Sequence, residues 1–128
     1  GIDLSPCHND PMPGNFMVNP DGMKLIDFEF CGDNEPTYEL GLFFCEMFYD
    51  DEEMLPLVES YYGSVDPHAL ARIRVSRVMG DLKWGMWGII NSVVRDVGFD
   101  YWKYGIWKLM RAKAYQHSID WDASKLAI

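Results

Sequence analysis

The sequence is poor in cysteine, in basic residues and in long apolar runs, and each shortage argues against a class of protein. Its 3 cysteines show no C-x-x-C spacing, so neither a disulfide framework nor a zinc site is indicated. Acidic residues outnumber basic ones by 20 to 11, and the formal net charge of -9 argues against a nucleic-acid partner. No apolar run reaches the roughly 18 residues of a membrane span, and no signal peptide is apparent. We therefore expect a cytoplasmic protein.

Apolar and aromatic residues are abundant instead. Hydrophobic residues make up 48% of the 128 positions, and aromatic residues make up 15%, with 5 Trp, 7 Tyr and 7 Phe. This length predicts one globular domain, and so many rings exceed the needs of a minimal core. We expect some of them to line a pocket. The acidic surface suits a cationic ligand or bound Mg²⁺, although acidity also serves solubility alone.

Turn residues between two short apolar runs predict a β-hairpin near the N-terminus. Residues 16–27 read FMVNPDGMKLID, in which proline presets the turn and glycine supplies its left-handed position. The hairpin is expected to span roughly residues 15–30. It would bring the end of HNDPMPGN, residues 8–15, beside the start of DFEF, residues 27–30.

Helices are expected over the rest of the chain. Thr37 can cap a helix over 37–50, Asp50 or Asp51 a short helix to about Tyr62, and Gly63 ends that helix. Asp66 and Pro67 begin a long helix to about Val97, Asp100 caps a helix over 101–118, and residues 120–128 form a loose turn or short helix. Gly80, Gly85 and Gly88 predict close packing or a bend in the long helix. The fold class is α+β, mostly α: a hairpin followed by a helical bundle.

Two polar segments carry the residues that phosphoryl transfer needs. Asp10 supplies a carboxylate that can orient an attacking hydroxyl, while Asn15 and Asp27 supply hard oxygen ligands for Mg²⁺. We expect Asp27 on the strand that returns from the hairpin, so that all three side chains meet at one end. His8 is expected to hold the loop by hydrogen bonding. Each residue alone is typical of an ordinary polar turn, but their combination indicates a kinase-type site.

These segments resemble a known family. HNDPMPGN resembles the H-x-D-x-x-x-x-N motif of the aminoglycoside phosphotransferase and choline kinase superfamily, which has a protein-kinase-like fold. LIDFEF, residues 25–30, resembles the I-D-F-E-Y segment of choline and ethanolamine kinases. The resemblance implies that Asp10 acts as the base, that Asn15 and Asp27 bind Mg²⁺, and that Glu29 supports the metal site.

The resemblance continues along the helices. ELGLFFCEMFYD, residues 39–50, is similar to a choline kinase stretch whose glutamate contributes to a cation pocket, which implies substrate-binding roles for Glu46 and Tyr49. LKWGMWGIINSVV and FDYWKYGIWKLMR resemble two later family segments. Where many family members continue with another aromatic residue, this chain has Asp51, which leaves the choice between choline and ethanolamine open.

Two pairs of aromatic residues repeat at a spacing of three. Trp84 with Trp87 and Tyr101 with Tyr104 each share a helix face, a pattern that by itself is typical of ordinary helix packing. With the resemblance, these rings become the expected walls of a cage for a quaternary ammonium, held by cation–π contact. Glu46 or another nearby acid would complete the neutralisation of the cation.

The resemblance implies ATP-dependent phosphorylation of choline or ethanolamine, giving phosphocholine or phosphoethanolamine, with Mg²⁺ as cofactor. The family places a glycine-rich phosphate loop and a strand lysine in an N-terminal lobe, and neither motif occurs in this sequence. We therefore expect residues 1–128 to be the C-terminal lobe only, which receives ATP from a missing N-terminal lobe. Such a chain would be inactive alone and would expose an apolar patch that favours self-association.

Other functions remain open at this level. Aminoglycoside, homoserine and methylthioribose kinases share the catalytic motif, although the W-x-x-W segment argues against them. A non-catalytic remnant that binds an amine or a partner protein is a second class. A purely structural helical protein is a third, and it leaves the ordered series of motifs unexplained.

Overall fold

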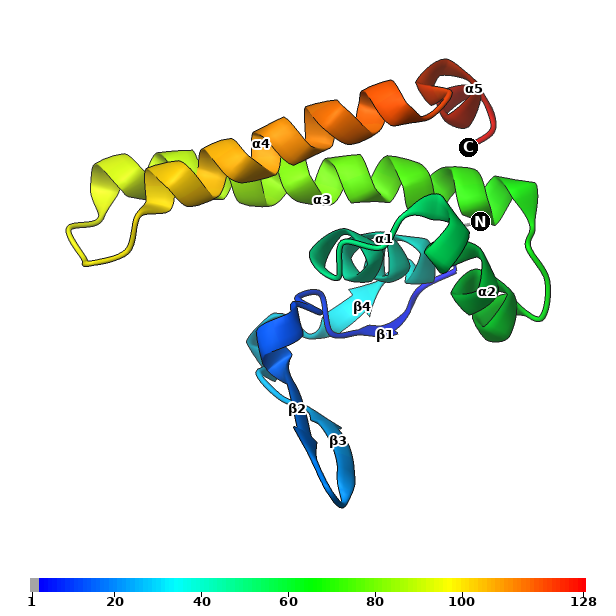
Figure 1. Cartoon of the computed structure of the whole chain (residues 1–128), viewed down its shortest axis with the longest axis horizontal. Coiled ribbons are helices and arrows are strands. Elements are labelled where there is room, and N and C mark those ends of the chain that lie inside the picture. The colour runs from blue at the N-terminus through cyan, green and yellow to red at the C-terminus, as the bar shows by residue number, and fades with distance from the viewer. Residues whose placement is uncertain (1–2) are drawn as a thin grey trace.

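Residues 3–128 are described by a computed structural model in which helices predominate and two small antiparallel sheets lie near the N-terminus (Figure 1). This agrees with the expected α+β, mostly α class. No helix in the described part of the chain is long and apolar enough to cross a membrane. The longest elements are α3, Pro67–Val94, and α4, Tyr101–Ser118, which lie side by side and run in opposite directions (Figure 1).

The expected hairpin is present but shorter than predicted. It consists of β2, Phe16–Asn19, and β3, Gly22–Leu25, with Asn19 paired to Gly22 at the turn. Asp27 does not lie on the returning strand, so that prediction was wrong. Its φ of 65° takes the chain out of the extended path, and it caps a single 3-10 turn, η2, over Phe28–Phe30.

A second sheet was not predicted. The strand β1, Ser5–Cys7, pairs with β4, Gly32–Asn34, and places Cys7 opposite Gly32. Strands of three residues are too short to show an alternating pattern, and β4 reads GDN, which is typical of a turn. A 3-10 turn, η1, over Pro13–Asn15 separates β1 from the hairpin. The two small sheets therefore bracket the expected catalytic loop.

The helix α1, Pro36–Glu46, differs from its prediction at both ends. Glu35, not Thr37, is the N-cap residue, because Pro36 occupies the first helical position, where a missing N–H costs nothing. The helix ends at Glu46 rather than at residue 50, and Phe48 then takes a left-handed φ of 60°. The helix α1 thus ends four residues earlier than expected, and residues 47–50 form a turn that leads into the next helix.

The other helix boundaries follow local capping signals. Asp50 caps α2, Asp51–Tyr62, by a reciprocal capping box with Glu53, and Gly63 ends it with a φ of 77°, as predicted. Asp66 and Asp100 cap α3 and α4, also as predicted. The helix α3 ends at Val94 rather than Val97, and the tail forms a short helix, α5, Trp121–Leu126.

Glycines allow α3 and α4 to approach closely, as the sequence predicted. A Cβ atom built on Gly88 would lie 2.8 Å from the Gly105 Cα and 2.9 Å from the Tyr101 carbonyl oxygen. The backbones are therefore in direct contact at this crossing. The main core lies elsewhere, where α1, α2 and α3 bury the side chains of Phe44, Met54, Val58 and Ile73 completely.

Candidate active site

The loop after β1 is fastened to α1 by one carboxylate. The Glu39 Oε1 atom accepts from the His8 amide at 3.1 Å, and its Oε2 atom accepts from the Asn9 amide at 2.9 Å. Both loop residues are buried. A charged acceptor on two buried amides makes strong hydrogen bonds, so the loop is held rigidly on the helix.

His8 links the loop to the chain that follows the hairpin. Its Nε2 atom lies 2.7 Å from the Ile26 carbonyl oxygen, and its Nδ1 atom accepts from the Asp10 amide at 3.3 Å. Since a carbonyl can only accept, the neutral imidazole must carry its proton on Nε2. Both ring nitrogens are thus used in positioning, and the ring edge rests on Phe28 at a centroid distance of 4.7 Å.

Asn9 and Glu39 are loop-positioning residues that the motif analysis missed. Asn9 adopts a left-handed φ of 65°, donates to the Phe30 carbonyl at 3.0 Å and accepts from the Asn34 side chain at 2.8 Å. Asparagine tolerates this conformation better than most residues, which was the one available signal in the sequence. Nothing in the sequence indicated that Glu39 would hold the loop, because its hydrogen-bond partners lie about 30 residues away.

Two of the three residues expected to meet, Asp10 and Asn15, are in contact, and the backbone brings Asp27 near them. The Asn15 Nδ2 atom donates to the Asp10 carbonyl at 2.9 Å and lies 3.5 Å from its carboxylate Oδ2. The Ile26 amide donates to the Asn15 carbonyl at 2.9 Å, which brings the following residue, Asp27, beside the loop. Burial raises the pKa of Asp10 and Glu46 raises it further, opposed by His8 and Asn15, with a smaller increase from Asp27.

The oxygen atoms of this group fit a hard divalent cation. The side-chain Nδ2 atom of Asn15 donates its hydrogen bonds to Asp10, and the side-chain oxygen of Asn15 accepts no hydrogen bond from residues 3–128. The Asp27 carboxylate is exposed and forms no ion pair within the same residues. Glu29, two residues further along the chain, is also exposed. Amide and carboxylate oxygens without protein donors are the ligands that Mg²⁺ prefers.

Aromatic side chains from three segments form a continuous ring cluster. Trp87 lies at centroid distances of 5.7 Å from Trp84, 5.3 Å from Tyr101 and 5.9 Å from Tyr104, in edge-to-face arrangements. The structure thus joins all four rings that the sequence singled out. Two further members were missed: Phe30, 5.6 Å from Trp84, and Phe99, 4.8 Å from Tyr101.

The ring cluster lies close to the loop. The pKa of Tyr104 is raised well above its ordinary value, first by burial and then by the charges of Glu46 and Asp10. A cavity of about 780 Å³ opens beside Glu46 and Tyr104 and is lined mainly by α4, with Phe48 and Phe99 at its edges. Of the predicted site residues, Glu46 and Tyr104 line this cavity, whereas Asp10, Trp84, Trp87 and Tyr101 do not.

Tyr49 does not join the ring cluster. Its ring contacts Phe43 and Phe44 at centroid distances of 5.9 and 6.2 Å, and its carbonyl accepts from Arg77 at 2.7 Å. These neighbours belong to the core between α1 and α2. The structure therefore places Tyr49 in packing rather than at the expected substrate pocket.

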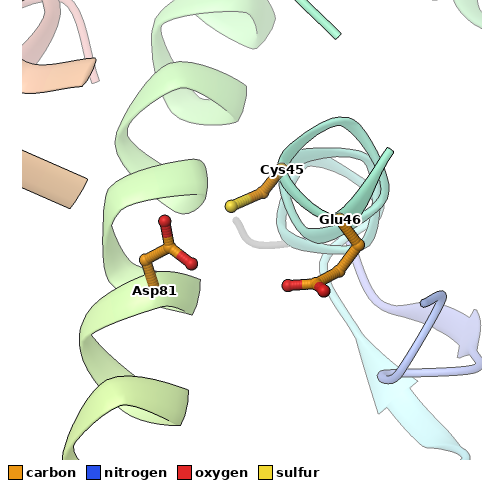
Figure 2. A group of neighbouring side chains, drawn as sticks. All are labelled: Cys45, Glu46 and Asp81. Carbon is orange, nitrogen blue, oxygen red and sulfur yellow. The ribbon is translucent and has the colours of Figure 1, made fainter. Parts of the chain in front are cut away.

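Glu46 belongs to a cluster that resembles a metal site in composition. Figure 2 shows Cys45 and Glu46 of α1 facing Asp81 of α3. Possible ligand atoms of these three residues lie within 4.8 Å of one another. Arg111 already supplies a cation there: it donates to both Asp81 oxygens at 2.8 and 2.6 Å and to Glu46 Oε1 at 3.0 Å. Burial raises the pKa of the Cys45 thiol to about 12. We therefore interpret this cluster as a buried ion-pair network.

The site can be compared with known proteins. A family model described as choline/ethanolamine kinase matches residues 3–69. The probable choline kinase 1 of Arabidopsis thaliana is 30% identical over 125 residues, covering 77% of this chain and 36% of that protein. A crystal structure of a choline/ethanolamine kinase family protein from Mesorhizobium loti covers 99% of this chain and 44% of its own, with a TM-score of 0.90 and 26% identity.

A crystal structure of LicA in complex with AMP is also similar, with a TM-score of 0.70 and 26% identity over 92% of this chain and 40% of its own. The chain thus spans between a third and a half of the length of the proteins it matches. The family match covers more than half of the sequence and includes the loop, the hairpin and α1. The chain therefore belongs to the choline/ethanolamine kinase family.

Proposed function

We propose that the natural protein containing this chain transfers a phosphoryl group from ATP to the hydroxyl of choline or ethanolamine. In this proposal residues 1–128 form the C-terminal lobe, which binds the amino alcohol and Mg²⁺. The observation that carries it is the loop, which holds Asp10 against Asn15 and beside Asp27, close to Glu46 and Tyr104.

Asp10 would orient the substrate hydroxyl and accept its proton. A raised pKa makes a carboxylate a better proton acceptor, and the carbonyl and amide of Asp10 are both fixed by hydrogen bonds. His8 acts through the Asp10 amide and does not need to react. The loop backbone is thus fixed, while the Asp10 carboxylate, which has only the long 3.5 Å contact with Asn15, can meet the substrate.

Asn15 and Asp27 would hold Mg²⁺, with Glu29 supporting the site from η2. When bound, Mg²⁺ neutralises charge on the transferring phosphates. The nucleotide itself would be held largely by a further lobe, for which the greater length of the related proteins leaves room. The residues of this chain then supply the acceptor side of the reaction.

The ring cluster would bind the cationic end of the substrate. Trp87 is exposed and Tyr104 is partly exposed, whereas Trp84 and Tyr101, which pack against Trp87, are buried. A ring in direct contact with a cation contributes about 0.5 to 2 kcal/mol to its binding. Aminoglycosides are larger and carry several charges, homoserine carries a carboxylate beside its ammonium, and methylthioribose carries no cation. An aromatic cluster thus favours a small amino alcohol over those acceptors.

The test uses the natural full-length protein with Mg²⁺, ATP and each candidate acceptor. Asp10→Asn should abolish turnover of choline and ethanolamine without changing the melting temperature, because the substitution keeps the size of the side chain. Asp21→Asn, at the exposed hairpin turn, is the matched control and should behave as wild type. Equal turnover by Asp10→Asn and wild type would refute the assigned role.

Calorimetric titration distinguishes the proposed enzyme from a non-catalytic amine-binding remnant. A remnant would bind choline but give no phosphocholine with ATP, whereas the proposed enzyme does both. Absence of binding and turnover for choline and ethanolamine, with turnover of an aminoglycoside, homoserine or methylthioribose, would assign the chain to one of the related kinases instead.

A further inference from the structure

One protein ammonium group already lies where the proposed function requires a substrate cation. Lys108 of α4 is only 8% exposed, forms an ion pair with Glu46, and places its Nζ atom 5.2 Å from the centroid of the Tyr104 ring. An acid and an aromatic ring are the two features that would attract a substrate amine. Lys108 therefore has the partners expected of a bound primary ammonium.

Glu46 faces two protein cations before any substrate arrives. Lys108 and Arg111 both bind its Oε1 atom, and Arg111 also pairs with Asp81, so the two carboxylates and two cations balance in charge. The Oε2 atom accepts no hydrogen bond from the described residues. A substrate ammonium that approached Oε2 would share the carboxylate with Lys108, and like charges a few ångströms apart repel strongly in a partly buried site.

We propose that Lys108 is a specificity determinant that favours a quaternary ammonium over a primary one, an inference that rests on the function proposed above. A primary ammonium exchanges its hydrogen bonds with water for acceptors in the site, so it must come close to Glu46 and hence to Lys108. A trimethylammonium group donates no hydrogen bond, and its methyl groups keep its nitrogen away from the carboxylate. It can bind to the exposed ring of Trp87 without competing with Lys108 for Glu46.

The test measures kcat/KM for choline and for ethanolamine in the natural full-length protein. Lys108→Met keeps the length of the side chain and removes its charge, while Arg111 remains paired with Glu46. We expect the ratio of choline to ethanolamine kcat/KM to fall by about tenfold, through a gain for ethanolamine. Lys108→Arg keeps the charge and should keep the wild-type ratio.

Lys83→Met is the matched control for loss of a positive charge near the rings. The Lys83 Nζ atom lies 4.8 Å from the Trp84 ring centroid, but it forms no ion pair within residues 3–128. Its removal should leave the ratio unchanged. An equal change for Lys83→Met and Lys108→Met would overturn the inference, because it would reflect general charge rather than competition at Glu46.

An unchanged ratio in Lys108→Met, or an equal loss for both amines, would also overturn the inference and leave Lys108 a structural role. Lys108→Gln provides a second neutral variant with the same expectation, in case the first does not fold. Failure of the proposed function is visible separately, because wild type would then phosphorylate neither choline nor ethanolamine. That outcome would remove this inference as well.

Discussion

The crossing of α3 and α4 predicts a measurable cost for adding one methyl group at Gly88. The Cβ of Gly88→Ala would lie 2.8 Å from both the Cα and the nitrogen of Gly105, and 2.9 Å from the Tyr101 carbonyl oxygen. All three are backbone atoms, so no change of rotamer can relieve the contact. Because ordinary contacts of carbon atoms are about 3.5 to 4.0 Å, the helices would have to separate by about 1 Å.

Two opposing effects determine how much Gly88→Ala lowers the free energy of unfolding. Alanine favours a helix over glycine by about 1 kcal/mol, whereas overpacking of a tight interface costs about 1 to 3 kcal/mol. The same separation would loosen the contact of Trp87 with Tyr101, whose centroids are 5.3 Å apart. We expect a net loss of about 1 kcal/mol in the free energy of unfolding, or a fall of roughly 2 to 8 °C in melting temperature.

Thermal and urea unfolding of the natural full-length protein measure this loss, and amine KM reports on the ring cluster. Gly98→Ala is the control, because its Cβ would meet no atom within 4 Å in the loop between the same two helices. We expect Gly98→Ala to be at least as stable as wild type, since alanine restricts the unfolded chain. A Gly88→Ala variant as stable as wild type, with unchanged KM, would refute the direct backbone contact.

Three further predictions concern the charged and thiol groups. Asp81→Asn should lower the free energy of unfolding by about 3 kcal/mol in urea titration, because it leaves Arg111 with one fewer buried partner; full stability would argue against the pair. The Arg72 hydrogen bond lowers the pKa of Glu35, so this pair stabilises the fold above the ordinary pKa of 4.5, and the stabilisation is lost as pH falls through the lowered folded pKa. In Glu35→Gln, the free energy of unfolding should therefore depend less steeply on pH in that range. An unchanged pH dependence of the free energy of unfolding would contradict this. Iodoacetamide at pH 8 should alkylate exposed Cys31 but spare Cys45, whose pKa is raised to about 12, and peptide mass spectrometry would reveal the reverse.

Local signals in the sequence were sufficient for most helix starts. An aspartate that accepts from the amide three residues on needs only its own segment, which is why Asp50, Asp66 and Asp100 were identified. The same reasoning failed at α1, where Thr37 competed with a proline that already fixed the start one residue earlier. The hairpin turn was also predictable, but the left-handed Asp27 that ends it was not.

Among the motif residues too, local features were predictable from the sequence and long-range partners were not. The spacing of Asp10 and Asn15 is local, and the order of the motifs along the chain identified the family before any contact was known. The partners of Glu46 are different in kind, because Lys108 and Arg111 lie 62 and 65 residues away. Only the packing of α4 against α3 and α1 brings their charges to this carboxylate.

The sequence by itself thus determined most helix caps, the hairpin turn and the pairs of rings, because these depend on residues within a few positions of one another. The tertiary structure decided that Tyr49 packs against the core, that Asn9 and Glu39 hold the loop, and that Lys108 pairs with Glu46. Contacts between distant segments depend on how whole helices pack, and helical periodicity marks the packed face without identifying its partner residues.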